Sequence, residues 1–143
     1  MKRLFFSLIA LMLATPALAQ GITKYPFDGS FEDASFALES EIIGKGLVID
    51  YIARSGDMLA RTGADVGSDV KLFDAADVYL FCSAVLSRKV MEVNPDNIAF
   101  CPYGIFIADR NGEVTIGYRN FPEGEMQEIQ ALLDEIARAA ADQ

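Results

Sequence analysis

The chain has 143 residues, of which 12 are basic, 21 are acidic and none is histidine, and its net charge is −9. The lack of histidine excludes Ser-His-Asp and Cys-His nucleophile systems and every metal or haem site that needs an imidazole ligand. The excess of negative charge makes nucleic acid and anionic membrane surfaces poor partners, because such a surface repels phosphate groups at long range.

The N-terminus has the order of charged, apolar and small residues that is typical of a secretory signal. Lys2 and Arg3 precede an apolar run, and Ala17-Leu18-Ala19 predicts cleavage after Ala19. Residues 1–19 are therefore a predicted signal peptide, and residues 20–143 are predicted to form a single domain. An uncleaved membrane anchor is the alternative, but the apolar stretch is shorter than the roughly 20 residues of a bilayer span. We expect a periplasmic protein with no membrane insertion after signal cleavage.

The first part of the domain predicts a helix between two strands. The strands are expected at Ile22 to Phe27 and at Leu47 to Ala53, which is rich in β-formers. Ser30 is a predicted N-cap, and Gly44 and Gly46 supply the exit of the helix. Apolar residues recur on one face of this helix at Phe31, Ala34, Leu38 and Ile42. We therefore predict a helix that faces the core.

The pattern weakens from Ser55 to Asp77, where three glycines and five aspartates surround few apolar residues. We predict a short helix near Met58 and then a mobile connection. The aspartates fit no compact calcium loop, and a solvated acidic surface is the favoured interpretation.

A continuous apolar run from Val78 to Cys82 predicts a central strand that is covered on both faces. Ser83 is the predicted N-cap of the helix that follows, and Asn94-Pro95 is its predicted end. The spacing of Leu86, Val90 and Val93 predicts a buried stripe on this helix.

The C-terminal part predicts a hairpin and a helix. Tyr103 to Asp109 and Glu113 to Arg119 alternate around Asn111-Gly112, a pair that favours a tight hairpin turn. An amphipathic helix is expected to pack on the sheet through Met126, Ile129, Leu133, Ile136 and Ala140. The whole pattern predicts an α/β (α+β) fold of two layers, with a mixed sheet and helices packed on one face.

Cys82 and Cys101 are the two cysteines of the chain. A disulfide between them requires only that the strand after Cys101 starts near the place where the strand before Cys82 ends. Two cysteines of an exported protein are expected to oxidise, and a bridge over a loop of this length stabilises a domain by about 3 kcal/mol. We favour a structural disulfide.

Two other interpretations of the cysteines stay open. Because Cys82 precedes a predicted helix N-terminus, it could be an acidic nucleophile that Cys101 resolves, in thiol-disulfide exchange or sulfur carriage. Buried unpaired thiols are the third interpretation. A metal site is disfavoured, because a third cysteine and histidine are both missing, and no cofactor is predicted.

Three residues near the hairpin are candidate ligand-binding residues, namely Tyr103, Tyr118 and Arg119. Alternate positions of a half-buried strand attract aromatic residues in any case. Packing is therefore favoured over a ligand pocket.

The segment FCSAVLSRKVMEVNPDNIAFCPYGIFIADRNGEV, with FEDASFALESEIIGKGLVIDYIA before it, resembles the domain of unknown function 302 family. The resemblance implies a fold of the TATA-binding-protein-like class and a homodimer, with exported redox or sulfur-metabolism proteins as partners. Gly104 departs from the family, where a larger and often basic residue is expected, and an anion-contacting role at this position is therefore in doubt. The residues that match the family pattern are Phe81, Cys82, Ser83, Cys101, Pro102 and Tyr103.

The leading hypothesis from the sequence is an exported binding or accessory module without catalytic activity, which the Cys82–Cys101 bridge stabilises and which self-associates. The alternative is a periplasmic thiol-disulfide redox or sulfur-carrier protein that uses the same two cysteines.

Overall fold

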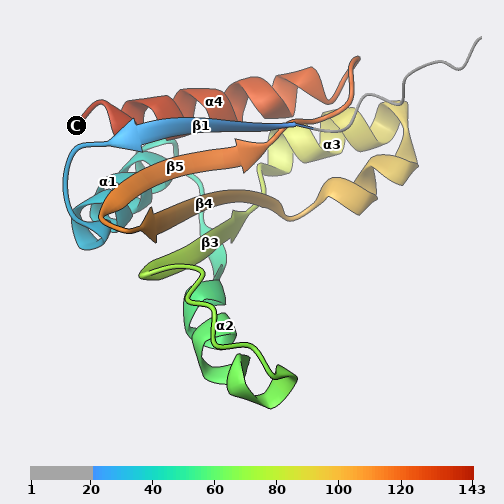
Figure 1. Ribbon diagram of the computed structural model, residues 1–143. Helices are drawn as coiled ribbons and strands as arrows, with labels where there is room; N and C mark the ends of the chain where they lie inside the picture. The colour runs from blue at the N-terminus through green and yellow to red at the C-terminus, as the bar shows by residue number, and fades with distance from the viewer. Residues whose placement is uncertain (1–20) are drawn as a thin grey trace, which may run out of the picture.

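The computed structural model describes residues 21–143, which form one sheet with helices around it (Figure 1). The predicted signal peptide and its cleavage after Ala19 lie outside the described residues. The strands are β1 (Ile22–Phe27), β2 (Ile49–Ala53), β3 (Ala75–Phe81), β4 (Tyr103–Arg110) and β5 (Glu113–Arg119). The helices are α1 (Phe31–Gly44), α2 (Ser55–Thr62), α3 (Ala84–Val93) and α4 (Gln127–Ala141), with two short 3-10 helices, η1 (Ala64–Val66) and η2 (Pro95–Phe100).

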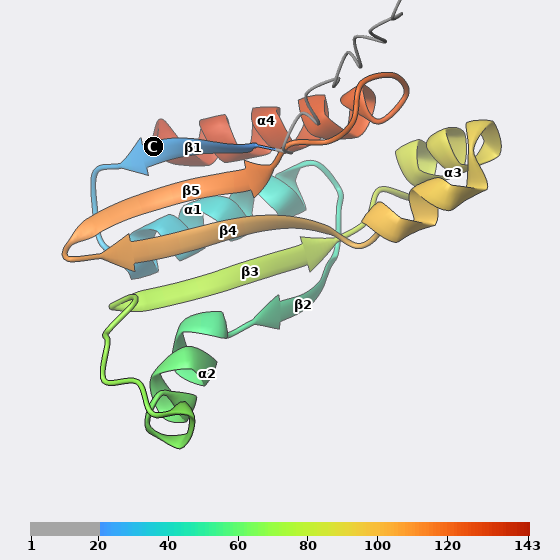
Figure 2. The ribbon, with the colours of Figure 1, turned by 45° about the vertical axis from the view of Figure 1, so that its right-hand side comes forward.

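The sheet has the strand order β1-β5-β4-β3-β2, and every neighbouring pair is antiparallel. The prediction of a mixed sheet was therefore wrong. Helix α3 and the 3-10 helix η2 lie at one end of the sheet (Figure 2), which is the return between the two cysteine-bearing strands that a disulfide required. The chain consequently re-enters the sheet at the end where it left it, and β4 runs antiparallel to β3.

Helices α1 and α4 cover one face of the sheet, as the prediction of one helix-covered face required (Figure 2). The α/β class is confirmed. The predicted stripe of α4 is also confirmed, because its residues are all at most 2% exposed. Between this helix layer and the sheet lie the fully buried side chains Leu38, Ile42, Ile105, Ile107, Ile116, Ile129, Leu133 and Ile136.

Local signals set two of the boundaries as predicted. The side chain of Ser30 accepts a hydrogen bond from the backbone of Asp33, and the Asp33 carboxylate accepts one from the Ser30 backbone, which makes a capping box at the start of α1. Asn111 and Gly112 have φ angles of 59° and 81° and form the turn between β4 and β5. These positive φ values explain why this residue pair specifies a tight hairpin.

Two predictions about burial need correction. Val78 and Leu80 of β3 are only half-buried, because the face of the sheet opposite α1 and α4 carries no helix layer. In α3, Val90 is buried but Val93 is 67% exposed, since this helix lies beyond the end of the sheet and not across it.

The weakly patterned segment forms α2 and η1 and then leads into β3, which begins at Ala75, three residues earlier than predicted. Helix α2 lies against β3: a side chain at Gly56 would meet the backbone nitrogen of Ala76 at 2.6 Å. Within residues 21–143, no helix is both long and apolar enough to span a membrane.

Candidate functional site

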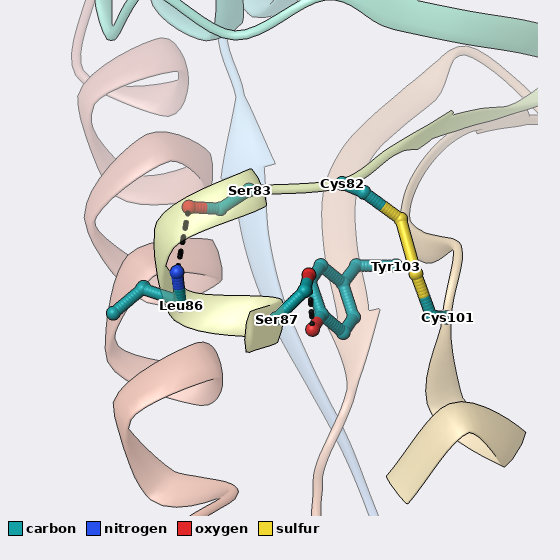
Figure 3. The surroundings of a disulfide bond; sticks show 6 residues. All are labelled: Cys82, Ser83, Leu86, Ser87, Cys101 and Tyr103. Carbon is teal, nitrogen blue, oxygen red and sulfur yellow. Dashed lines mark hydrogen bonds between the residues drawn. A yellow bond between two sulfur atoms is a disulfide. The ribbon is translucent and has the colours of Figure 1, made fainter. Parts of the chain in front are cut away.

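Cys82 and Cys101 form a disulfide, with their Cα atoms 6.6 Å apart (Figure 3). Cys82 follows β3 and Cys101 follows η2, so the bridge closes the base of the unit formed by α3 and η2. Both cysteines are half-buried. The predicted pairing is confirmed, and unpaired thiols are ruled out.

The surroundings of the bridge are hydrogen-bonded (Figure 3). The Ser83 hydroxyl accepts a hydrogen bond of 3.3 Å from the backbone N–H of Leu86 and so caps α3 as predicted. The hydroxyls of Ser87 and Tyr103 are hydrogen-bonded to each other at 2.9 Å. The Ser87–Tyr103 hydrogen bond ties α3 to β4 beside the disulfide.

The two basic side chains of α3, Arg88 and Lys89, form ion pairs with glutamates. Lys89 donates to both carboxylate oxygens of Glu128, at 2.6 and 2.7 Å, and Arg88 pairs with Glu92. Neither is therefore available to stabilise a thiolate at Cys82.

The structure does not bring the three candidate ligand-binding residues together. Tyr103 and Tyr118 are 1% and 2% exposed and belong to the core on the helix-covered face. Arg119 follows Tyr118 on β5 and is exposed. Because successive residues of a strand point to opposite faces, Arg119 lies on the face opposite to Tyr118. The two tyrosines are therefore buried in the core, whereas Arg119 lies on the other side of the sheet.

Tyr118 belongs to a polar cluster that sequence analysis missed. Its hydroxyl donates to Asp134 of α4 at 2.6 Å, and the Tyr25 hydroxyl of β1 donates to the same carboxylate oxygen. Arg138 donates to the other oxygen of Asp134 at 3.0 Å. Hydrogen bonds from Tyr118 and Tyr25 lower the pKa of Asp134, whereas burial, and then the bond to Asp134, raises the pKa of Tyr118. The cluster fastens α4 to the sheet.

The face of the sheet opposite the helix layer, which we call the open face, is largely apolar. One cross-strand row contains Val78, Phe106, Gly117 and Lys24, which pair in that order across β3, β4, β5 and β1. A neighbouring row contains Ala76, Ala108, Thr115 and Pro26. Small residues thus keep much of this face flat.

A hollow of about 540 Å³ lies on the open face. Val78, Phe106 and Ala108 are among its apolar lining residues, and Lys24 and Arg110 are its basic ones. A second hollow, of about 460 Å³, lies beside α2. Phe73 lines both, so that the two adjoin. Both volumes fall in the range of small-molecule sites.

Gly117 shows how the floor of the open-face hollow is built. A side chain there would meet the Phe106 ring at 2.7 Å and Lys24 Cγ at 3.0 Å. The missing side chain therefore lets the Phe106 ring and the Lys24 stem lie on the sheet. Within residues 21–143, no group of three or more Cys, Asp or Glu side chains is arranged to hold a metal ion.

The comparisons with known proteins identify a family. Residues 23–143 match the model described as "Domain of unknown function DUF302". A crystal structure of an uncharacterized conserved protein DUF302 from Bacillus stearothermophilus aligns with a TM-score of 0.61 at 18% identity, over 85% of this chain and 95% of that chain. Among curated proteins, none matches this chain. The structural likeness shows the shared fold.

Removing the disulfide is expected to lower stability without changing the fold. Replacing Cys82 and Cys101 together by serine should lower the free energy of unfolding by about 3 kcal/mol, because the unfolded chain gains loop freedom. Urea unfolding monitored by circular dichroism measures this loss. As a control, Ser40→Ala changes an exposed hydroxyl on α1 and should leave the unfolding midpoint nearly unchanged. Equal stability of the double variant and the wild type would contradict a structural role.

The Asp134 cluster predicts a pH-dependent contribution to stability. Asp134→Asn should lower the free energy of unfolding by about 1 kcal/mol near pH 7, since an amide is a weaker acceptor than a carboxylate. Because the folded-state pKa of Asp134 is lowered, its contribution is complete above about pH 5 and is lost as the pH falls through that lowered pKa.

Urea unfolding of wild type and variant at a series of pH values tests this expectation. The two proteins should differ at neutral pH and converge in strong acid. Asp142→Asn, which removes an exposed carboxylate from the end of α4, is the matched control. A difference that stayed constant down to about pH 2 would show that the variant acts by some means other than this ionisation.

Proposed function

The chain belongs to the domain of unknown function DUF302 family, and we propose that it is an exported accessory module that binds a ligand on the open face of its sheet. The observation that carries the proposal is the hollow of about 540 Å³ over Val78, Phe106 and Ala108. An antiparallel sheet with one solvated face normally alternates apolar and polar residues. Here the solvated face is apolar, which is the usual mark of an interaction surface.

The edges of the sheet support binding on the face and not by strand addition. The β1 edge carries Lys24 and Pro26, and β2 is a five-residue strand with an irregular register between Ile49 and Tyr51. Lysine, proline, short strands and bulges are the features by which proteins block pairing at sheet edges. Neither edge strand, β1 or β2, is therefore well suited to pair with a strand of a partner, whereas the open face provides an apolar contact surface.

The Cys82–Cys101 bridge supports this function as a structural element. It closes the α3 and η2 unit at the end of the sheet, and neither Cys82 nor Cys101 lines the hollow on the open face. The alternative, a thiol-disulfide redox or sulfur-carrier role, predicts a bridge that small dithiols reduce readily in the native protein. The homodimer and the exported redox or sulfur-metabolism partners implied by the family resemblance stay predictions.

Binding of a neutral fluorescent probe tests the open face. N-phenylnaphthylamine, which fluoresces in apolar sites, should bind the native protein saturably at one site per chain. Ala108→Glu should weaken that binding by about tenfold or more, because a carboxylate would stand on the apolar floor and lose its hydration under the probe.

The matched control is Val85→Glu, which adds the same charge at a position of α3 that is 77% exposed and outside the hollow. It should leave probe affinity unchanged. The proposal fails if the native protein shows no saturable binding, or if both variants weaken binding equally. Circular dichroism of each variant confirms that the fold is intact.

Export is the second part of the proposal, and Lys2, Arg3 and the small residues up to Ala19 support it. The protein recovered from the periplasm of an expressing bacterium should have the mass of residues 20–143. Intact mass spectrometry with and without alkylation reports this mass and the oxidised cysteine pair together. Recovery of the full-length chain from the cytoplasm alone would contradict export.

A further inference from the structure

The basic residues of the chain are unevenly paired with acids. Residues 1–20 contain no Asp or Glu, so side-chain ion pairs can form only with acids of the described part of the chain. Of the ten basic residues in 21–143, six form ion pairs there. Acids outnumber bases, so partners are not scarce. The four basic residues that make no ion pair are Lys24, Arg61, Arg110 and Arg119.

Three of these four lie on the open face. Lys24 and Arg110 line its hollow. Arg119 of β5 is paired in register with Ile22, a lining residue of the same hollow on β1. Unpaired cations therefore gather on the one apolar face that has no helix layer.

Lys24 and Arg119 are close neighbours by register. Lys24 pairs with Gly117 and Ile22 pairs with Arg119, so that Lys24 and Arg119 are diagonal neighbours on adjacent strands. Diagonal neighbours have Cα atoms about 7–8 Å apart, within the combined reach of two long side chains. Two like charges so placed repel each other unless an anion lies between them. We call this pair the basic corner.

Carboxylates do not neutralise the basic corner. Of the two acids that line the hollow, Asp77 is paired with Arg54. The other, Glu113, pairs in register with Arg110 at the hairpin end of β4 and β5, six positions from Arg119 on the same strand. The corner thus keeps a local positive charge in a protein whose net charge is −9.

The apolar floor adjoins the basic corner directly. The Phe106 ring and the stem of Lys24 both cover Gly117, and Val78 lies beside Phe106 on the next strand. A ligand with one anionic group at the corner would therefore lay an apolar body along the row from Phe106 to Val78. This arrangement combines a charged anchor with an apolar surface, as small-molecule sites commonly do.

We infer that the open face binds amphipathic organic anions, with the anionic head on Lys24 and Arg119 and the apolar body over Phe106 and Val78. The inference rests on the proposed function and names its ligand class. A small anion is favoured over a second copy of the chain, because a second copy brings its own net charge of −9 to the face.

Two dyes with the same aromatic body test the inference. Anilinonaphthalene sulfonate carries an anionic sulfonate, and N-phenylnaphthylamine lacks it. The native protein should bind the sulfonate at least about tenfold more tightly, since hydrogen bonds to charged groups contribute that much. Replacing Lys24 and Arg119 together by glutamine should abolish this preference, so that the double variant binds the two dyes with equal affinity.

A control with the same change in net charge separates the corner from the overall field. Arg61 and Arg88 lie on α2 and α3, outside the open-face hollow, and their replacement together by glutamine should preserve the preference. Arg110→Gln should also preserve it, because Arg110 lies at the hairpin end of the hollow.

The outcomes distinguish the two proposals. Equal affinity of the native protein for both dyes overturns the anion inference and leaves the proposed function standing. Loss of preference in the Arg61 and Arg88 control, or in Arg110→Gln, overturns the placement of the head at the corner. Failure to bind the neutral dye overturns the proposed function itself. Sedimentation could instead show a dimer that binds neither dye and that Ala108→Glu dissociates. That result would assign the open face to a second copy of the chain and would overturn both proposals.

Discussion

Burial of one face of the sheet under α1 and α4 is the constraint on which the other features of the structure depend. Ile105, Ile107 and Ile116 are fully buried in this layer, and each such side chain contributes about 1.5–3 kcal/mol. Successive residues of a strand point to opposite faces, so the register that buries these isoleucines also fixes what the other face presents. A slip of one residue would bring Phe106 and Ala108 inward and expose the core. The open face is therefore held in place by the core behind it.

The polar cluster and the disulfide act on this layer from different directions. Asp134 receives hydrogen bonds from Tyr25 and Tyr118, on neighbouring strands at one edge of the sheet, and so sets where α4 lies. The disulfide joins the residue that follows β3 to the segment that leads into β4. Neither feature lines the hollow on the open face. Loss of the Asp134 cluster or of the disulfide would therefore change the stability of the domain more than the shape of the open face.

Sequence reasoning succeeded where the signal was local. The Asn111-Gly112 turn, the N-cap at Ser30 and the stripe of α4 depend on residues a few positions apart, and each was predicted. The cysteine pair was predicted because the chain contains two cysteines and few ways to use them. These signals are sufficient to give the fold class.

The remaining features depend on contacts between distant residues. The apolar run from Val78 predicted a strand buried on both faces. An apolar sequence indicates that its side chains avoid water, but it does not indicate whether a helix, another strand or a ligand covers them. Tyr25 and Asp134 are 109 positions apart, and nothing near either residue indicates the other. The unpaired cations of the open face likewise emerge only from the register of β1 on β5. Arg119 was a candidate from the sequence, but its partners on the open face were out of reach of sequence patterns, although the largely apolar β3 run was a sign of that face.

Gly104 connects the family resemblance to the open face. A side chain there would meet Val78 and Leu80 at 3.3 Å, so the missing group leaves these residues as part of a smooth surface. Since Ile105 pairs with Tyr118, the position of Gly104 adjoins that of Arg119 on β5. Where relatives are expected to carry a larger and often basic residue, this chain has an open surface with a cation one strand away. The apolar floor therefore runs past Gly104 without an intervening side chain, up to the strand that carries Arg119.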